Sequence, residues 1–179
     1  MNLRRLIFGI CFIATTCAWV EAQPTHQAEP QQTHFSAEDA AFQNPVPVPG
    51  DVLALLEAEP VVRDALKNNQ GADDKVPPAW FSATELQLRL NGKPDLLVRA
   101  EPPLAGANTD YFWIFRNPGS GYALVLGGPA HDLEIRNRRS HGSRDIALIS
   151  MTAAELHTVV YRFNGMRYVV YREKSEPIK

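Results

Sequence analysis

Three short groupings contain the residue types that acid–base or nucleophilic catalysis uses. They are His131-Asp132, His141-x-Ser143-x-Asp145 and Glu155-x-His157. A histidine beside a carboxylate can act as a general base, and a neighbouring serine can act as a nucleophile. However, the sequence has neither a Gly-x-Ser-x-Gly elbow nor a His-Glu-x-x-His pattern. We therefore expect a non-catalytic protein. The alternative is a hydrolase that acts on envelope polymers or peptides through these His and Asp residues.

A basic stretch, residues 136–141 with the sequence Arg-Asn-Arg-Arg-Ser-His, is a local peak of positive charge in an acidic chain. Arg136, Arg138 and Arg139 are therefore candidate ligand-binding residues for an anionic partner, either a phosphate-bearing envelope polymer or an acidic groove on another protein. The other interpretation is a solvated hairpin tip, because runs of charge usually face water. The sequence leaves both interpretations open.

Aromatic residues form a second candidate surface. Tyr111, Trp113 and Phe115 alternate with Phe112 and Ile114. On a strand the two sets lie on opposite faces, so both faces are apolar and a central strand covered on each side is expected. If one face is uncovered, Tyr111 and Trp113 form a platform for a sugar or peptide. The core interpretation is favoured, since aromatic strand residues mostly fill cores.

A pattern of turn and strands occurs twice, with Asp95 and Asp145 in equivalent places about 50 residues apart. The first copy contains residues 91–98, 111–116 and 121–126, and the second contains residues 141–148, 159–163 and 167–171. Each aspartate follows a glycine by three residues and precedes an apolar run. Such residues commonly fix a turn by accepting backbone N–H bonds, and we expect Asn91, Asp95 and Asp145 to do so.

Residues 80–168 resemble secreted bacterial domains related to FG-GAP/VCBS-type β repeats, in which an Asp-rich loop precedes a short apolar strand. Residues 90–98 look like that loop with its central Asp-Gly missing, and Arg89 stands where its first Asp is expected. The resemblance implies a calcium loop. Calcium needs six to eight oxygen ligands, and Asn91 and Asp95 are too few. We predict no metal and no cofactor, with a degenerate metal loop as the alternative role of these residues.

The fold predicted is α+β, with two short N-terminal helices packed on a twisted antiparallel β meander of about seven or eight strands with an internal two-fold repeat. Residues 50–69 are expected to form the helices, with Asp51 as N-cap, Pro60 in the first turn of the second helix and Gly71 after its end. The strands are expected at 84–90, 96–100, 112–117, 122–126, 133–137, 145–150, 156–163 and 167–172. Asn164-Gly165 predicts a hairpin turn.

The N-terminus predicts export. Arg4 and Arg5 precede a short apolar run, so residues 1–22 are expected to be a signal peptide. A retained anchor, or lipidation at Cys17, remains an alternative. Both cysteines lie in this segment, so the mature chain has no thiol chemistry. Residues 23–49, rich in Pro and Gln, are expected to be a disordered linker before a single α+β domain at 50–179.

These features predict a secreted or periplasmic protein without a stable membrane span after signal cleavage. Its expected partners are an envelope polymer or another exported protein. Nucleic acid is not expected, because 20 acidic residues exceed 18 basic ones and non-specific binding to nucleic acid requires a basic field.

Overall fold

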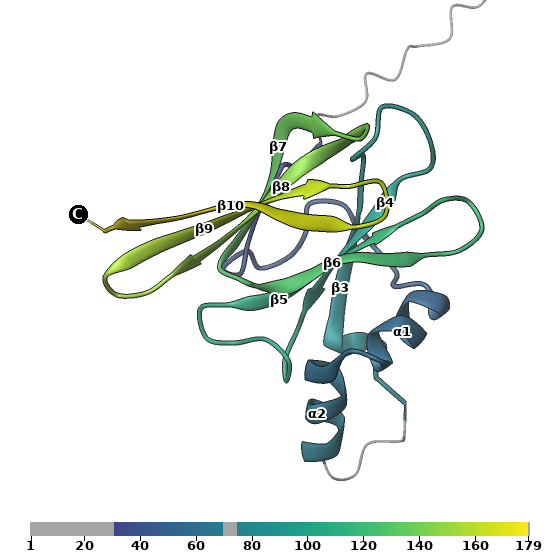
Figure 1. Ribbon diagram of the computed structural model, residues 1–179. Coiled ribbons are helices and arrows are strands. Elements are labelled where there is room, and N and C mark those ends of the chain that lie inside the picture. Colours follow the sequence, from purple (N-terminus) through teal and green to yellow (C-terminus); the bar gives the residue numbers. More distant parts are fainter. Residues whose placement is uncertain (1–30, 70–74, 179) are drawn as a thin grey trace, which may run out of the picture.

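The computed structural model describes residues 31–69 and 75–178, which form two antiparallel sheets and two short helices (Figure 1). The predicted signal peptide and residues 23–30 of the predicted linker lie outside the described residues, as does Gly71. No helix among the described residues is long and apolar enough to cross a membrane.

The helix-covered sheet has the strand order β2-β3-β4-β5-β6. Its strands are β2 Pro45–Val46, β3 Phe81–Leu86, β4 Asp95–Ala100, β5 Asp110–Arg116 and β6 Ala123–Ala130. A short 3-10 helix, Pro78–Trp80, leads into β3. All six residues of β4 are buried, because other parts of the chain cover both of its faces.

The outer sheet has the strand order β1-β7-β8-β9-β10. Its strands are β1 His34–Ser36, β7 Asp132–Ser140, β8 Ser143–Met151, β9 Glu155–Phe163 and β10 Tyr168–Pro177. The β9–β10 hairpin turns at Asn164-Gly165, as predicted, and Gly165 has a φ of 103°, which favours glycine. The Asn164 side chain accepts the backbone N–H groups of Met166 and Arg167.

The core between the two sheets holds apolar side chains from both of them. It includes Phe35, Phe42, Leu97, Phe112, Ile114, Leu133, Ile146, Leu148 and Phe163. A second core lies on the opposite face of the helix-covered sheet and includes Leu96, Val98, Trp113 and Phe115. The alternation along β4 and β5 therefore sends neighbouring side chains into different cores.

The helices are α1 Gly50–Glu57 and α2 Pro60–Asn68, and both bury apolar residues in the second core. Figure 1 shows them on one side of the molecule, away from the β9–β10 hairpin. Pro60 lies in the first turn of α2, as predicted. The N-cap prediction was wrong, because Pro49 is the N-cap residue and Asp51 lies in the first turn of α1.

The structure confirms the predicted class in its coarse form, antiparallel β with two short helices, but not the single meander with a two-fold repeat. The first copy of the sequence pattern forms β4, β5 and β6 of the helix-covered sheet, whereas the second forms β8, β9 and β10 of the outer sheet. The physical reason is the amount of apolar surface. Both faces of β4 and β5 are apolar, so they need a second sheet on one side and helices on the other.

The linker prediction was also wrong for residues 31–49. His34–Ser36 pairs with β7, and Pro45–Val46 pairs with β3. Phe35 is 1% exposed and Phe42 is 4% exposed, so this segment contributes two aromatic rings to the core. Arg99 also donates to the carbonyl oxygens of Ser36 and Asp39. Burial of the two rings offsets the entropy of ordering the segment. The Pro-rich and Gln-rich composition did not indicate this burial.

Candidate functional site

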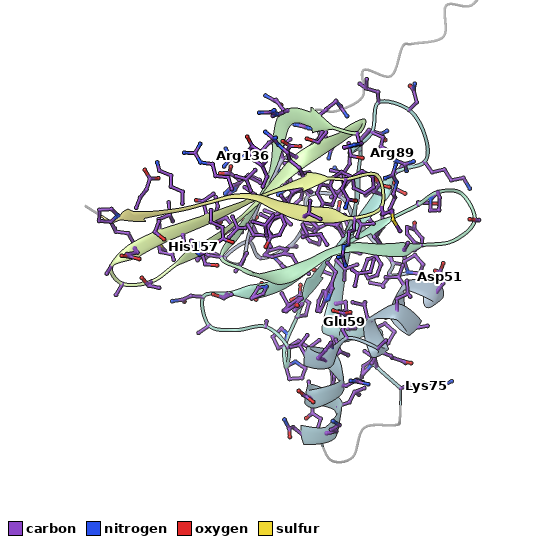
Figure 2. All side chains as sticks on the ribbon, viewed as in Figure 1. Asp51, Glu59, Lys75, Arg89, Arg136 and His157 are labelled. Atoms are coloured by element: carbon purple, nitrogen blue, oxygen red, sulfur yellow. The ribbon has the colours of Figure 1, made fainter. Side chains whose placement is uncertain are left out.

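A shallow cavity of about 430 Å³ lies on the face of the outer sheet that points away from the core. We call it the basic groove. Its lining residues come from β7, β8, β9 and β10, and they are Arg136, Arg138, Asp145, Thr158, Val160, Arg162, Tyr171, Arg172, Lys174 and Glu176. Figure 2 shows Arg136 on the side of the molecule opposite Glu59 and the helices.

Strand pairing explains why these side chains meet. Thr158, Val160 and Arg162 alternate along β9 and therefore share one face of the sheet. The β9–β10 register places Arg172 opposite Val160 and Lys174 opposite Thr158, where directly opposed side chains touch. Cations that are distant in the sequence are therefore neighbours in space.

Positive charge dominates the groove. Arg136, Arg138, Arg162, Arg172 and Lys174 line it, against the carboxylates of Asp145 and Glu176. Glu176 pairs with Lys174, and Glu134, which is outside the lining, lies 2.9 Å from Arg136. Among the described residues no ion pair involves Arg172, and the side chain of Arg138 is 66% exposed. Two guanidinium groups are thus available to an anion from solvent.

Asp145 lies under the groove and holds its floor in place. Its side chain is 2% exposed, accepts a hydrogen bond from the Ser140 hydroxyl at 2.6 Å and pairs with Arg162 Nε at 3.2 Å. Arg138 Nε is more distant, at 3.8 Å. The prediction that Asp145 fixes its turn through backbone N–H groups was wrong, because its partners are a hydroxyl and a guanidinium. Its negative charge compensates for the positive charge of Arg162, which the fold places beside it.

An arginine–aromatic contact completes the floor. The guanidinium carbon of Arg162 lies 3.0 Å from the centroid of the Tyr171 ring, and that of Arg138 lies 5.9 Å from it. Arg162 is therefore fixed by a ring on one side and a carboxylate on the other. Arg138 has only loose contacts with the same two groups, so it can reorient toward a ligand.

Arg139 does not belong to the groove, although it was predicted to bind ligand with its neighbours. Its Nη1 donates to the carbonyl oxygen of Leu88 at 2.7 Å and so links the β7–β8 hairpin to the segment just after β3. Arg144 likewise donates to the carbonyl oxygen of Arg136 at 3.0 Å. Burial, and then the nearby charge of Arg139, lower the pKa of Arg144. Both arginines tie parts of the chain together.

The aromatic pair of β5 is part of the core. Trp113 is 0% exposed, lies 5.8 Å from Phe81 between ring centroids and donates its indole N–H to Glu59 at 3.2 Å. Tyr111 is half-buried beside it, with ring centroids 4.6 Å apart. The platform hypothesis is wrong for Trp113, because the helices cover it. The expectation of a central strand covered on both faces is confirmed.

Asp95 is buried at the start of β4, and its partners lie in the turn before that strand and in the loop after β5. Its Oδ1 accepts the backbone N–H of Asn117 at 3.0 Å and lies 2.9 Å from Arg89 Nη2. Asp95 thus links Arg89, in the turn before β4, to the loop after β5, and the backbone N–H that it accepts comes from Asn117 and not from its own turn. Asn91 is exposed in that turn. Arg89 stands where the resemblance would put the first Asp of the loop, and its guanidinium is the cation that pairs with the Asp95 carboxylate.

Among the histidines that the structure describes, His131 has the closest contacts with carboxylates. His131 Nδ1 is 3.0 Å from Asp132 Oδ2, and its Nε2 is 3.4 Å from Glu38 Oε1. The hydrogen bond to Asp132 is the main reason that the pKa of His131 is raised, although burial opposes it. His141 Nδ1 contacts the carbonyl oxygen of Phe163 at 2.9 Å, and His157 lies 3.9 Å from Glu173. The structure does not bring the three histidines together.

Metal ligation has no support in the part of the chain that the structure describes. Within residues 31–69 and 75–178, no group of three or more His, Cys, Asp or Glu could hold a metal ion. Comparison of the chain with protein-family models, with curated proteins and with solved structures yields no match. The resemblance to FG-GAP/VCBS-type repeats therefore stays a prediction.

Sequence reasoning missed Arg162, Arg172 and Lys174, which supply more than half of the positive charge of the groove. A signal for them was present. Thr158, Val160 and Arg162, and then Arg172 and Lys174, recur at every second position of two strands joined by an Asn-Gly turn. In a hairpin, such residues lie on one face.

Proposed function

We propose that this chain is an exported, non-catalytic binding domain associated with the cell envelope, and that the basic groove holds an anionic ligand. Export rests on the N-terminal sequence, and the binding role rests on the groove. The single observation that carries the proposal is the gathering of five cations around one cavity, in a chain whose acidic residues outnumber its basic ones. A cluster of cationic side chains around one cavity commonly marks a site that binds anions.

A phosphate-bearing polymer of the envelope is the ligand that fits the groove best. Four of the five cations are arginines, and a guanidinium binds phosphate through two parallel hydrogen bonds. The groove is open and lies along neighbouring strands, so it suits a chain with repeated charges better than a small enclosed ligand. Arg172 and Arg138 would bind it first, because Asp145 and Tyr171 already hold Arg162.

Retention on envelope fractions tests this proposal. The purified protein is passed over an envelope fraction that carries phosphate polymers and over the same fraction after its phosphate has been removed. We expect retention on the first and loss of retention on the second. Hydrolase turnover on the same fractions is measured in parallel. Turnover without retention would reverse the preference between binding domain and enzyme.

The hydrolase alternative depends on the His131–Asp132 pair, which at 3.0 Å is the shortest histidine–carboxylate contact among the described residues. It has less support than binding. His131 is 9% exposed, and the chain around Glu38 lies over its Nε2. Four cavities among the described residues, the basic groove included, have no histidine in their lining. A histidine that is so little exposed is poorly placed for acid–base catalysis on a polymer.

A further inference from the structure

Two large apolar side chains stand out at the loops on one end of the sandwich. Met166 is 83% exposed and Leu90 is 76% exposed, more than any other large apolar side chain among the described residues. Met166 lies in the β9–β10 turn, and Leu90 lies in the turn before β4. Neither residue belongs to either core, so core packing does not require an apolar side chain at these two positions.

The contacts of their neighbours place both residues at the same end of the molecule. Arg89 donates to the carbonyl oxygen of Asn117 at 2.9 Å, next to Arg116. The Arg116 guanidinium carbon in turn lies 4.2 Å from the ring centroid of Phe163, where the β9–β10 turn begins. Figure 2 shows Arg89 at this end, far from His157. We call the two turns, residues 89–93 and 164–167, the apical turns.

Positive charge surrounds these apolar tips. Lys93 and Arg167 are exposed in the apical turns themselves, and Arg116 is half-exposed beside them. The carboxylate of Asp95 is buried and already paired with Arg89. The exposed carboxylate of Asp51, at the start of α1, lies close to Gly121 in the loop after β5. The apical turns themselves contain three cations, Arg89, Lys93 and Arg167, and no carboxylate.

We propose that the apical turns dock on an anionic lipid bilayer, with Leu90 and Met166 entering the interface and with Lys93 and Arg167 at the level of the headgroups. The two apolar tips do not bury each other, since both are more than three-quarters exposed, whereas a fluid apolar layer accommodates both. Lysine and arginine beside the tips complement a negative membrane surface. This binding is independent of the basic groove, because none of the four residues lines it.

Vesicle co-sedimentation tests the proposal with the full chain. The vesicles contain equal parts of phosphatidylglycerol and phosphatidylcholine, or phosphatidylcholine alone. We expect the wild type to sediment with the anionic vesicles and to bind the neutral ones at least about tenfold more weakly. The double variant Leu90→Ser, Met166→Ser should lose about tenfold or more in affinity for the anionic vesicles. The double variant Lys93→Gln, Arg167→Gln should lose a similar factor.

Met151→Ser is the matched control, because Met151 is 49% exposed at the opposite end of the β8–β9 hairpin and should not affect binding. All of these side chains are exposed, so thermal melts should match the wild type. Arg172→Gln, in the basic groove, should also bind vesicles like the wild type. Failure of the wild type to sediment, or unchanged binding by the Leu90/Met166 variant, would overturn the proposal. So would an equal loss in Arg172→Gln, which would assign the lipid to the groove.

Discussion

Arg138 and Arg139 are adjacent in β7, yet their guanidinium groups serve different surfaces. Arg138 is 66% exposed over the basic groove, and Arg139 reaches the carbonyl oxygen of Leu88 at 2.7 Å. Two arginines with the same charge and nearly the same position can therefore be compared directly. The comparison separates a specific site from the general electrostatic field of the hairpin.

Arg138→Gln should weaken the binding of inorganic polyphosphate about fivefold, which corresponds to about 1 kcal/mol for one exposed charge pair. Arg139→Gln should leave that affinity unchanged and lower the free energy of unfolding by about 1 kcal/mol, the value of one lost hydrogen bond. Titration calorimetry and urea unfolding provide the two measurements. Equal weakening by both variants would indicate a diffuse charge effect.

Asp145→Asn should strengthen polyphosphate binding about fivefold while it destabilises the fold. The amide can still accept the Ser140 hydroxyl, but it no longer neutralises Arg162, which then becomes available to the ligand. Loss of the buried charge partner should cost about 1–2 kcal/mol of unfolding free energy. Opposite signs in the two assays are the distinctive result. Weaker binding by a folded Asp145→Asn protein would show that Asp145 positions the ligand-binding arginines.

Asp95→Ala should lower the unfolding free energy by about 2 kcal/mol or more, because it leaves Arg89 and the Asn117 N–H without their buried acceptor. Millimolar calcium should not change the melting temperature of the wild type, since the Asp95 carboxylate is already paired with the Arg89 guanidinium. A calcium-dependent rise that Asp95→Ala abolishes would contradict this account, because a ligand that binds the native state stabilises it by mass action.

The His131 cluster should make stability depend on pH. Asp132 and Glu38 contact both ring nitrogens, and His34 lies 3.5 Å from Asp132. Because the pKa of folded His131 is raised, mainly by the hydrogen bond with Asp132, the folded state keeps a proton that the unfolded state releases near pH 6.5. The contribution is complete below about pH 6.5 and is lost as the pH rises through the folded pKa.

Urea unfolding between pH 6 and pH 9 measures this dependence. The wild type should lose stability across the range above the ordinary histidine pKa of about 6.5. His131→Gln should flatten the curve, whereas His157→Gln, with a half-exposed ring 3.9 Å from Glu173, should not. A wild-type curve that rises with pH over this interval would contradict the sign of the effect.

The sequence correctly predicted the elements whose formation depends on a few neighbouring residues. Pro60 separates the two helices and Asn164-Gly165 forms a hairpin turn, because both features depend on the backbone preferences of a few residues. The burial of Trp113 also agrees with the favoured interpretation of alternating apolar residues. The division into two sheets was not predicted. The division depends on which strands pair at their edges, and the same alternation of apolar residues along the strands is compatible with one sheet or with two.

The candidate site was only partly predictable, for a related reason. Arg136 and Arg138 were predicted as ligand-binding residues because they are close in the sequence. Arg162 and Arg172 become their neighbours through the pairing of β8 with β9 and of β9 with β10. Arg139 lies outside the groove, because its guanidinium donates to the carbonyl oxygen of Leu88, just after β3 and distant in the sequence. Pairing between distant segments thus determines which charged side chains line the groove and which form hydrogen bonds within the fold.

The central claim, that the basic groove binds a phosphate-bearing polymer, is tested most directly by calorimetric titration of inorganic polyphosphate. The wild type is compared with the double variant Arg138→Gln, Arg172→Gln at several salt concentrations. We predict saturable wild-type binding that weakens as salt rises, because released counterions drive it. The double variant should bind at least about tenfold more weakly, with a shallower salt dependence. No wild-type binding, or identical affinity in the double variant, would contradict the account.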